Sequence, residues 1–148
     1  MIHAYDELYL SAARTSLGRM LDFAVYDLHY DLTAFFDLFI SSGIAARFES
    51  GDFTVLAGMS GIELAYLVLD KSYISYIRTE PRFTNGRSEE YWTGWALAYY
   101  QWETALCFSE IIRHIPIKDI MALYRPYHEM DIRQFVDQMN TLYHAANA

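Results

Sequence analysis

The histidines are the first residues to test for chemistry, because imidazole serves both as a metal ligand and as a general acid or base. A helical zinc site needs two histidines at positions i and i+4 on one face of a helix. No two histidines here have that spacing, although His29 and His128 each lie near a carboxylate in the sequence. The histidines are His3, His29, His114, His128 and His144. We therefore predict no metal site.

Cys107 is the only thiol of the chain, and no signature of a catalytic cysteine surrounds it. Nucleophilic catalysis would need a serine or cysteine beside a histidine that an acid orients, and the sequence offers no such arrangement. The segment 58–61 lacks the lysine and the preceding strand of a phosphate-binding loop. We predict a buried, inert Cys107, no catalytic residue and no cofactor.

The segment 125–131 has the composition of a recognition loop between two helices. It combines a rigid proline, an aromatic ring, both charges and a histidine, and loops of this kind often carry function. The candidate partner-binding residues are Arg125, Tyr127, His128, Glu129 and Asp131. The alternative is a capped corner between two helices with no binding role, and the sequence leaves both interpretations open.

Helices must position these side chains, since hydrophobic residues recur at three- and four-residue steps along most of the chain. Asp31, the Ser60–Glu63 capping box, Ser88 and Asp131 indicate helix starts. Pro116 and Pro126 are expected to end two short helices. Segment 72–88 is the least helical, with a turn signal at 84–86. The helices are expected over about 6–30, 32–40, 44–48, 62–71, 89–106, 109–115, 117–124 and 132–143.

The segment from about 89 to 106 is hydrophobic nearly all round, with a row formed by Trp92, Trp95, Tyr99, Trp102 and Leu106. A helix of this kind is normally wrapped by its neighbours. We predict an all-α fold, a compact orthogonal bundle of about six to eight short-to-medium helices around this central aromatic helix. The whole chain, residues 1–148, is expected to form a single helical domain.

The aromatic content exceeds what one small core should need, with 13 Tyr, 9 Phe and 3 Trp. Part of it is expected to face a protein partner or a second copy of the chain, because these residues are enriched at contact surfaces. The alternative is an aromatic-rich core. The most hydrophobic stretch, 91–108, is interrupted by Gln101 and Glu103, so we predict no membrane span. No signal peptide is recognisable, and a cytoplasmic location is expected.

The net charge of −8 argues against direct binding of nucleic acid, which depends on cations that displace counterions from phosphates. Residues 44–68 imitate the rhythm of a helix-turn-helix, but a recognition helix there would offer Glu63 and Asp70 against Lys71 alone. An acidic surface would instead attract a basic, nucleic-acid-associated protein.

Two blocks, Ala4–Leu64 and Glu90–Asn140, together about three-quarters of the chain, resemble a helical domain of small Firmicutes proteins. In that family the domain often precedes a Cro/repressor-like (XRE-type) helix-turn-helix. The genes lie beside small proteins, some similar to ADP-ribosyltransferases, in what look like toxin–antitoxin or defence operons. The resemblance implies the partner-binding part of an antitoxin and carries no catalytic residues. This chain ends at Ala148, where such relatives would continue into the DNA-binding domain.

The function predicted first is a non-catalytic, antitoxin-like domain that holds and neutralises a cognate toxin or regulates through a partner. One alternative is a free-standing acidic inhibitor, of the anti-defence type, that acts on a nucleic-acid-processing enzyme. Another is a dimerisation or sensory domain of a transcription regulator, which would make a homodimer.

Overall fold

Hydrophobic side chains at helical spacing form helices close to those that the sequence predicts, but residues 53–56 and 124–127 form two further short helices that it does not predict. A computed structural model describes residues 2–82 and 87–146, and all regular secondary structure within these ranges is helical. This confirms the predicted all-α fold. The elements are η1 (Glu7–Tyr9), α1 (Leu10–Tyr26), α2 (Leu32–Ser41), α3 (Ile44–Glu49), α4 (Phe53–Leu56), α5 (Gly61–Lys71), α6 (Glu89–Thr104), α7 (Phe108–His114), α8 (Ile117–Met121), α9 (Tyr124–Tyr127) and α10 (Ile132–Ala146).

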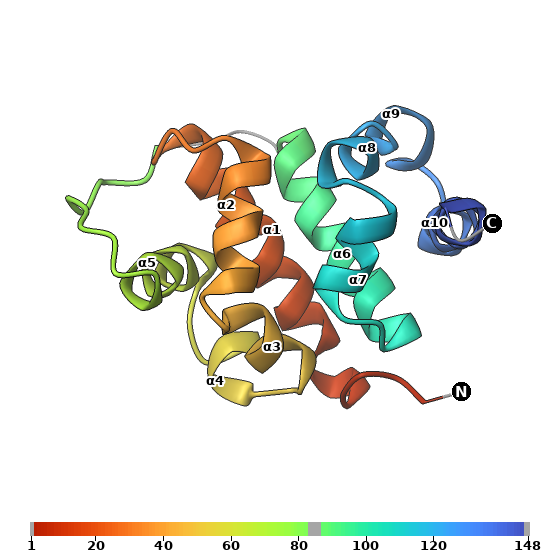
Figure 1. Cartoon of the computed structure of the whole chain (residues 1–148), viewed down its shortest axis with the longest axis horizontal. Helices are drawn as coiled ribbons and strands as arrows, with labels where there is room; N and C mark the ends of the chain where they lie inside the picture. Colours follow the sequence, from red (N-terminus) through yellow and green to blue (C-terminus); the bar gives the residue numbers. More distant parts are fainter. Residues whose placement is uncertain (1, 83–86, 147–148) are drawn as a thin grey trace.

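The helices α1 and α6 form the centre of the bundle, and the remaining helices surround this pair (Figure 1). Gly18 and Gly94 allow their backbones to touch. A Cβ atom on Gly94 would lie 2.6 Å from the carbonyl oxygen of Leu17, and one on Gly18 would lie 2.7 Å from that of Tyr91. The predicted central helix at about 89–106 is therefore confirmed as α6.

Local capping chemistry fixes several helix starts where the sequence predicts them. A short side-chain oxygen accepts a backbone N–H that has no partner within the helix. The contacts are Asp31 to Ala34 N at 3.1 Å, Ser60 to Glu63 N at 3.2 Å, Ser88 to Tyr91 N at 3.0 Å and Asp131 to Arg133 N at 2.9 Å. These caps set the first turns of α2, α5, α6 and α10.

The prediction that Pro126 ends a helix is wrong. Pro126 lies within α9, whose N-cap is Leu123, so the proline occupies the first turn. A proline is tolerated there because a first-turn N–H has no acceptor inside the helix. Pro116 behaves as predicted: α7 ends at His114, and Pro116 becomes the N-cap of α8.

The core is one continuous hydrophobic cluster with many edge-to-face aromatic contacts. Phe108 at the start of α7 packs against three phenylalanines of α2 and α3, with ring centroids 5.4–5.8 Å apart. These partners are Phe36, Phe39 and Phe48. Part of the high aromatic content therefore serves the core.

Residues 72–82 leave α5 without regular structure, as predicted, and polar contacts hold them on the bundle. Thr79 N donates to the Tyr66 hydroxyl at 2.9 Å, and Arg82 N donates to the Asp27 carboxylate at 2.7 Å. The guanidinium of Arg82 also lies 3.3 Å from the buried Asp22 carboxylate. The turn signal predicted at 84–86 lies outside the described residues.

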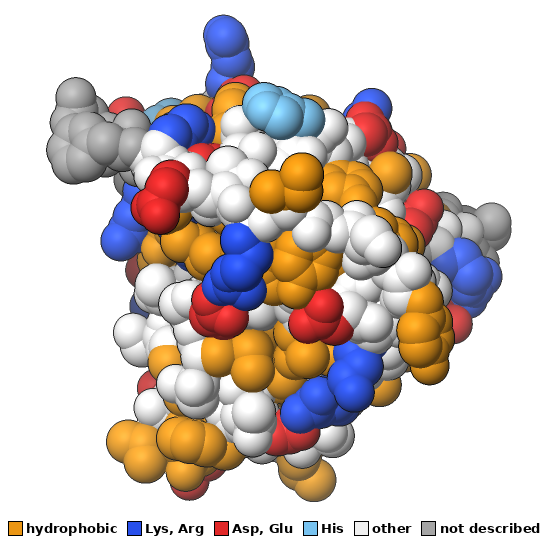
Figure 2. Space-filling model, turned by 90° about the vertical axis from the view of Figure 1, so that its left-hand side faces the viewer, with side chains coloured by type: hydrophobic (Ala, Val, Ile, Leu, Met, Phe, Trp, Pro, Cys, Tyr) orange, Lys and Arg blue, Asp and Glu red, His pale blue; other side chains and the backbone are white. Residues whose placement is uncertain are grey.

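The surface seen from the left of Figure 1 mixes hydrophobic, acidic and basic side chains (Figure 2). Hydrophobic side chains with large exposed fractions include Tyr73 at 96% and Ile77 at 88%. Among the described helices, none is long and apolar enough to span a bilayer.

Candidate binding site

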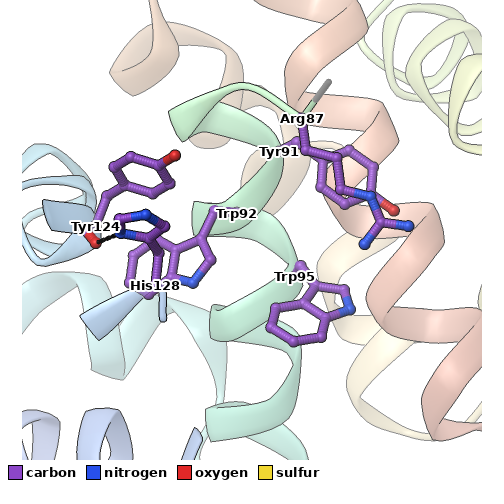
Figure 3. A pocket seen from close by; sticks show the side chains of 6 residues that line it. All are labelled: Arg87, Tyr91, Trp92, Trp95, Tyr124 and His128. Atoms are coloured by element: carbon purple, nitrogen blue, oxygen red, sulfur yellow. Dashed lines mark hydrogen bonds between the residues drawn. The ribbon is translucent and has the colours of Figure 1, made fainter. Parts of the chain in front are cut away.

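A pocket of about 230 Å³ lies between α6 and α9 and is lined mainly by aromatic rings. Figure 3 shows Trp92, Tyr124 and His128 on one side and Arg87, Tyr91 and Trp95 on the other. No carboxylate lines this pocket among the described residues. It is therefore a hydrophobic hollow whose charged lining is basic, on a chain whose net charge is −8.

The α6 side of the pocket follows from helical geometry. Tyr91 and Trp95 are four residues apart and lie on adjacent turns, while Trp92 points toward α9 (Figure 3). Tyr91 and Trp92 are buried, whereas Trp95 keeps partial exposure. The close contact of α6 with α1 at Gly94 fixes the helix, and so these rings are held before any partner binds.

The α9 side is built by a pair of stacked rings. The rings of Tyr124 and His128 lie 4.1 Å apart between centroids with an interplanar angle of 15°. His128 Nδ1 lies 2.7 Å from the carbonyl oxygen of Tyr124, which fixes the imidazole on the tyrosine. Trp92 packs edge-to-face on Tyr124 at 5.7 Å and on Phe135 of α10 at 5.2 Å. These contacts attach the α9 side of the pocket to α6 and, through Trp92, to α10.

Two arginines lie on the aromatic rings of α6. The Arg87 guanidinium carbon is 4.7 Å from the centroid of Tyr91. The Arg14 guanidinium carbon, from α1, is 3.4 Å from the centroid of Trp95 and 4.9 Å from that of Tyr99. Arg14 Nε also donates to the carbonyl oxygen of Trp95 at 3.2 Å. Cations on ring faces are attracted by the negative π-face.

Arg14 is a half-buried cation that no carboxylate neutralises among the described residues. Burial lowers the pKa of its guanidinium to about 10, which leaves it charged at neutral pH. Its Nη2 atom is buried and has no hydrogen-bond partner within the part of the chain that the structure describes. The Arg14 guanidinium beside Trp95 therefore has neither a carboxylate partner nor a hydrogen bond from Nη2 among the described residues.

The predicted partner-binding residues divide into two groups. His128 lines the pocket, and Glu129 does not, although its Oε1 lies 3.4 Å from His128 Nε2. Arg125 is exposed on α9 and Tyr127 packs against the core. Asp131 caps α10 and pairs with Arg133 at 3.5 Å. The structure places a helix corner at Tyr127 and Asp131 and a pocket-lining side chain at His128, and the partner-binding role of the segment stays a prediction.

The sequence did not identify the aromatic lining as a site. Trp92 and Trp95 were placed in a packed central helix, and Arg14 and Arg87 were not singled out. Arg14 is 81 residues from Trp95, so no local pattern could join them. The sequence signal that points to this site is the high content of Tyr and Trp.

Of the other groups considered for chemistry, His3 and Cys107 line one open hollow together with Glu49. No set of three or more His, Cys, Asp or Glu side chains in the described ranges is arranged to hold a metal ion. His114 stacks on Tyr143, and His3 stacks on Trp102 at the N-terminal end of the chain. Cys107 was predicted to be buried but is half-exposed, because it is the N-cap of α7; its Sγ lies 3.3 Å from Ser109 Oγ.

A second hollow lies farther along α6, against α10, and its lining carries both signs of charge. Arg133 lies there together with Glu103 and Asp137. A mixed lining of this kind selects weakly by charge, so the aromatic pocket is the stronger candidate.

Comparisons with known proteins identify no relative of this chain. No protein-family model matches it. Searches of curated proteins and of solved structures find no match either. The resemblance of Ala4–Leu64 and Glu90–Asn140 to the helical domain of XRE-type proteins therefore stays a prediction.

Proposed function

We propose that this chain is a non-catalytic protein-binding domain that holds and neutralises a cognate toxin, as an antitoxin does. The observation that supports binding is the pocket between α6 and α9, where aromatic rings meet arginines that lack carboxylate partners among the described residues. Trp, Tyr and Arg are the residues that most often carry the binding energy of protein interfaces.

The size of the pocket favours a protein partner over a free small molecule. Pockets for cofactors and substrates usually enclose roughly 300 to 1,000 Å³. A volume of about 230 Å³ is smaller and suits one bulky side chain that anchors a larger surface. Because α6 and α9 hold the lining rings in place, little side-chain ordering is required on binding.

The toxin-neutralising role is supported by the resemblance stated from the sequence. Five of the six residues that line the pocket lie in the second resembling block, whereas Arg14 of the first block packs on Trp95 without lining the pocket. A pocket formed mostly by one of these blocks suits a domain whose task in the operon is to hold its partner.

The test is co-expression with the protein encoded beside this gene, followed by co-purification and a growth assay for rescue from toxicity. We expect a stable complex, and we expect Trp95→Ala to weaken it by at least about tenfold, as loss of an interface anchor does. Tyr73→Ala is the matched control, because Tyr73 is 96% exposed and lies outside the pocket. Circular dichroism confirms that both variants are folded.

Failure to form a complex, together with no rescue of growth, would refute the antitoxin-like role. A complex that survives Trp95→Ala with unchanged affinity would refute the pocket as its binding site. Equal losses for Trp95→Ala and Tyr73→Ala would also count against the pocket.

A further inference from the structure

The arginines beside the aromatic pocket differ from most arginines of this chain. At six of the seven other arginines a carboxylate lies within 4 Å of the guanidinium, and Arg125, exposed on α9, is the exception; the six are Arg19, Arg47, Arg78, Arg82, Arg113 and Arg133. Arg14 and Arg87 have no such neighbour in the described ranges and lie on ring faces instead. In a protein with a net charge of −8, unneutralised cations gathered at one hollow are a specific local feature.

The two arginines differ in how they can act. Arg87 is exposed and lines the pocket, so its guanidinium is free to contact a bound group. Arg14 is half-buried on Trp95 and acts through that ring, as a fixed positive charge behind the pocket wall. Both favour a negative group at the mouth of the pocket.

Two acids that neighbour pocket residues in the sequence have partners of their own. Glu129 follows His128 in the chain, its Oε1 lies 3.4 Å from His128 Nε2, and 87% of its side chain is exposed. Glu90 accepts a hydrogen bond from the Tyr26 hydroxyl at 2.8 Å. At physiological salt, charges farther away than about 8 Å are largely screened, so the adjacent arginines outweigh the overall negative charge.

We propose that the pocket binds an acidic segment of the protein partner: a hydrophobic side chain enters between Trp95 and Tyr124, and a neighbouring carboxylate pairs with Arg87. This inference rests on the proposed function and names the chemistry of the partner. It also separates this surface from the basic partner that net charge alone suggests. A basic segment would place its cation against Arg87 and Arg14, which like-charge repulsion disfavours.

The test uses short acetylated peptides in which Leu-Phe lies between two pairs of glutamates, glutamines or lysines. Binding is followed by the indole N–H signals of Trp92, Trp95 and Trp102 in two-dimensional NMR spectra of the ¹⁵N-labelled full chain. Trp102 is an internal control, because its Nε1 donates to the carbonyl oxygen of Tyr5 at 2.8 Å and it does not line the pocket.

We expect the glutamate peptide to shift the Trp92 and Trp95 signals and to leave Trp102 unchanged. Its affinity should exceed that of the glutamine peptide by about fivefold, which corresponds to about 1 kcal/mol, and the lysine peptide should not bind. Arg87→Gln should reduce the affinity for the glutamate peptide to that for the glutamine peptide. Arg113→Gln is the matched control, since Arg113 is exposed on α7 and does not line the pocket.

The inference is overturned if the glutamine or lysine peptide binds as tightly as the glutamate peptide. It is also overturned if no peptide shifts Trp92 or Trp95, or if Arg87→Gln leaves the glutamate peptide unaffected. If the toxin complex is lost in Trp95→Ala and keeps its affinity in Arg87→Gln, that result supports the proposed function and refutes the proposal that the partner segment is acidic. If the glutamate peptide binds selectively but no toxin complex forms, the preference for an acidic segment stands and the antitoxin-like function is refuted.

Discussion

At the scale of single residues, Glu49 shows how burial changes a carboxylate that the bundle uses as a connector. Its Oε2 accepts a hydrogen bond from Phe108 N at 2.5 Å, which joins the end of α3 to the start of α7. Burial raises the pKa of the Glu49 carboxyl, and the hydrogen bond from Phe108 offsets this only in part. The folded state therefore prefers the protonated form more than the unfolded chain does.

This preference predicts the sign of a pH effect. A raised carboxyl pKa stabilises the fold at low pH, and that contribution is lost as pH rises above the ordinary value of 4.5. Glu49→Gln removes the titration and keeps an oxygen that accepts from Phe108 N. Urea denaturation should show the stability of Glu49→Gln relative to the unmodified chain increasing between about pH 4 and about pH 7.

Glu110 provides a control of opposite sign. Arg113 donates to its Oε2 at 2.8 Å and lowers the pKa of its carboxyl. Its contribution is present above the ordinary pKa of 4.5 and is lost as pH falls, so Glu110→Gln should lose relative stability over the same rise in pH. The same trend in both variants would contradict the explanation by burial at Glu49.

At the scale of elements, the contact of α1 with α6 decides where the aromatic pocket lies. Gly18 and Gly94 face each other across this contact, and a Cβ on Gly94 would lie 2.8 Å from the Cα of Gly18. All three nearest neighbours of that Cβ are backbone atoms, which cannot rotate away as a flexible side chain can. The rings of Tyr91 and Trp95 are therefore positioned by a backbone-to-backbone contact.

Gly94→Ala tests this contact, because two effects of opposite sign compete. In an open helix the change would stabilise by about 1 kcal/mol through helix propensity. Here overpacking should dominate, and we expect a net loss of about 1–3 kcal/mol in the free energy of unfolding measured in urea. The indole signals of Trp92 and Trp95 should shift as α6 moves. A gain in stability would show that α1 and α6 do not approach as closely as described.

The elements were largely predictable from the sequence, because their signals are local. Asp31, Ser60 and Ser88 cap helices through side-chain oxygens that reach backbone N–H groups three residues ahead. Pro126 misled because a proline in a first turn and a proline after a last turn look alike until the helix boundary is known. Local chemistry predicts where helices begin better than where they end.

The candidate site was much less predictable, since its parts meet only in the folded bundle. His128 was found because it lies in a connector with the composition of a recognition loop. Arg14 and Trp95 were not paired, because their contact depends on how α1 crosses α6. The spacing of Trp92 and Trp95 indicated a buried helix equally well, and only the position of α9 leaves Trp95 partly open.

At the scale of the whole molecule, the net charge of −8 is spread over a small bundle with a pI near 4.9. Self-repulsion of this kind keeps a protein soluble but destabilises its compact state. The exposed ion pairs of the chain, such as Arg113 with Glu110, contribute little in opposition, because water and salt weaken them. We therefore infer that long-range repulsion outweighs exposed ion pairs in the response to salt.

Thermal unfolding should accordingly become more difficult as sodium chloride rises from about 0.01 M to about 0.15 M, where the screening length falls from about 30 Å to about 8 Å. The double variant Asp37→Asn and Asp137→Asn removes two exposed acids without an ion-pair partner among the described residues, changing the net charge from −8 to −6. It should gain up to about 1 kcal/mol at low salt and respond less to added salt. A melting temperature that falls with salt would instead show that ion pairs, including those of Arg82 with Asp22 and Asp27, dominate the electrostatic stability.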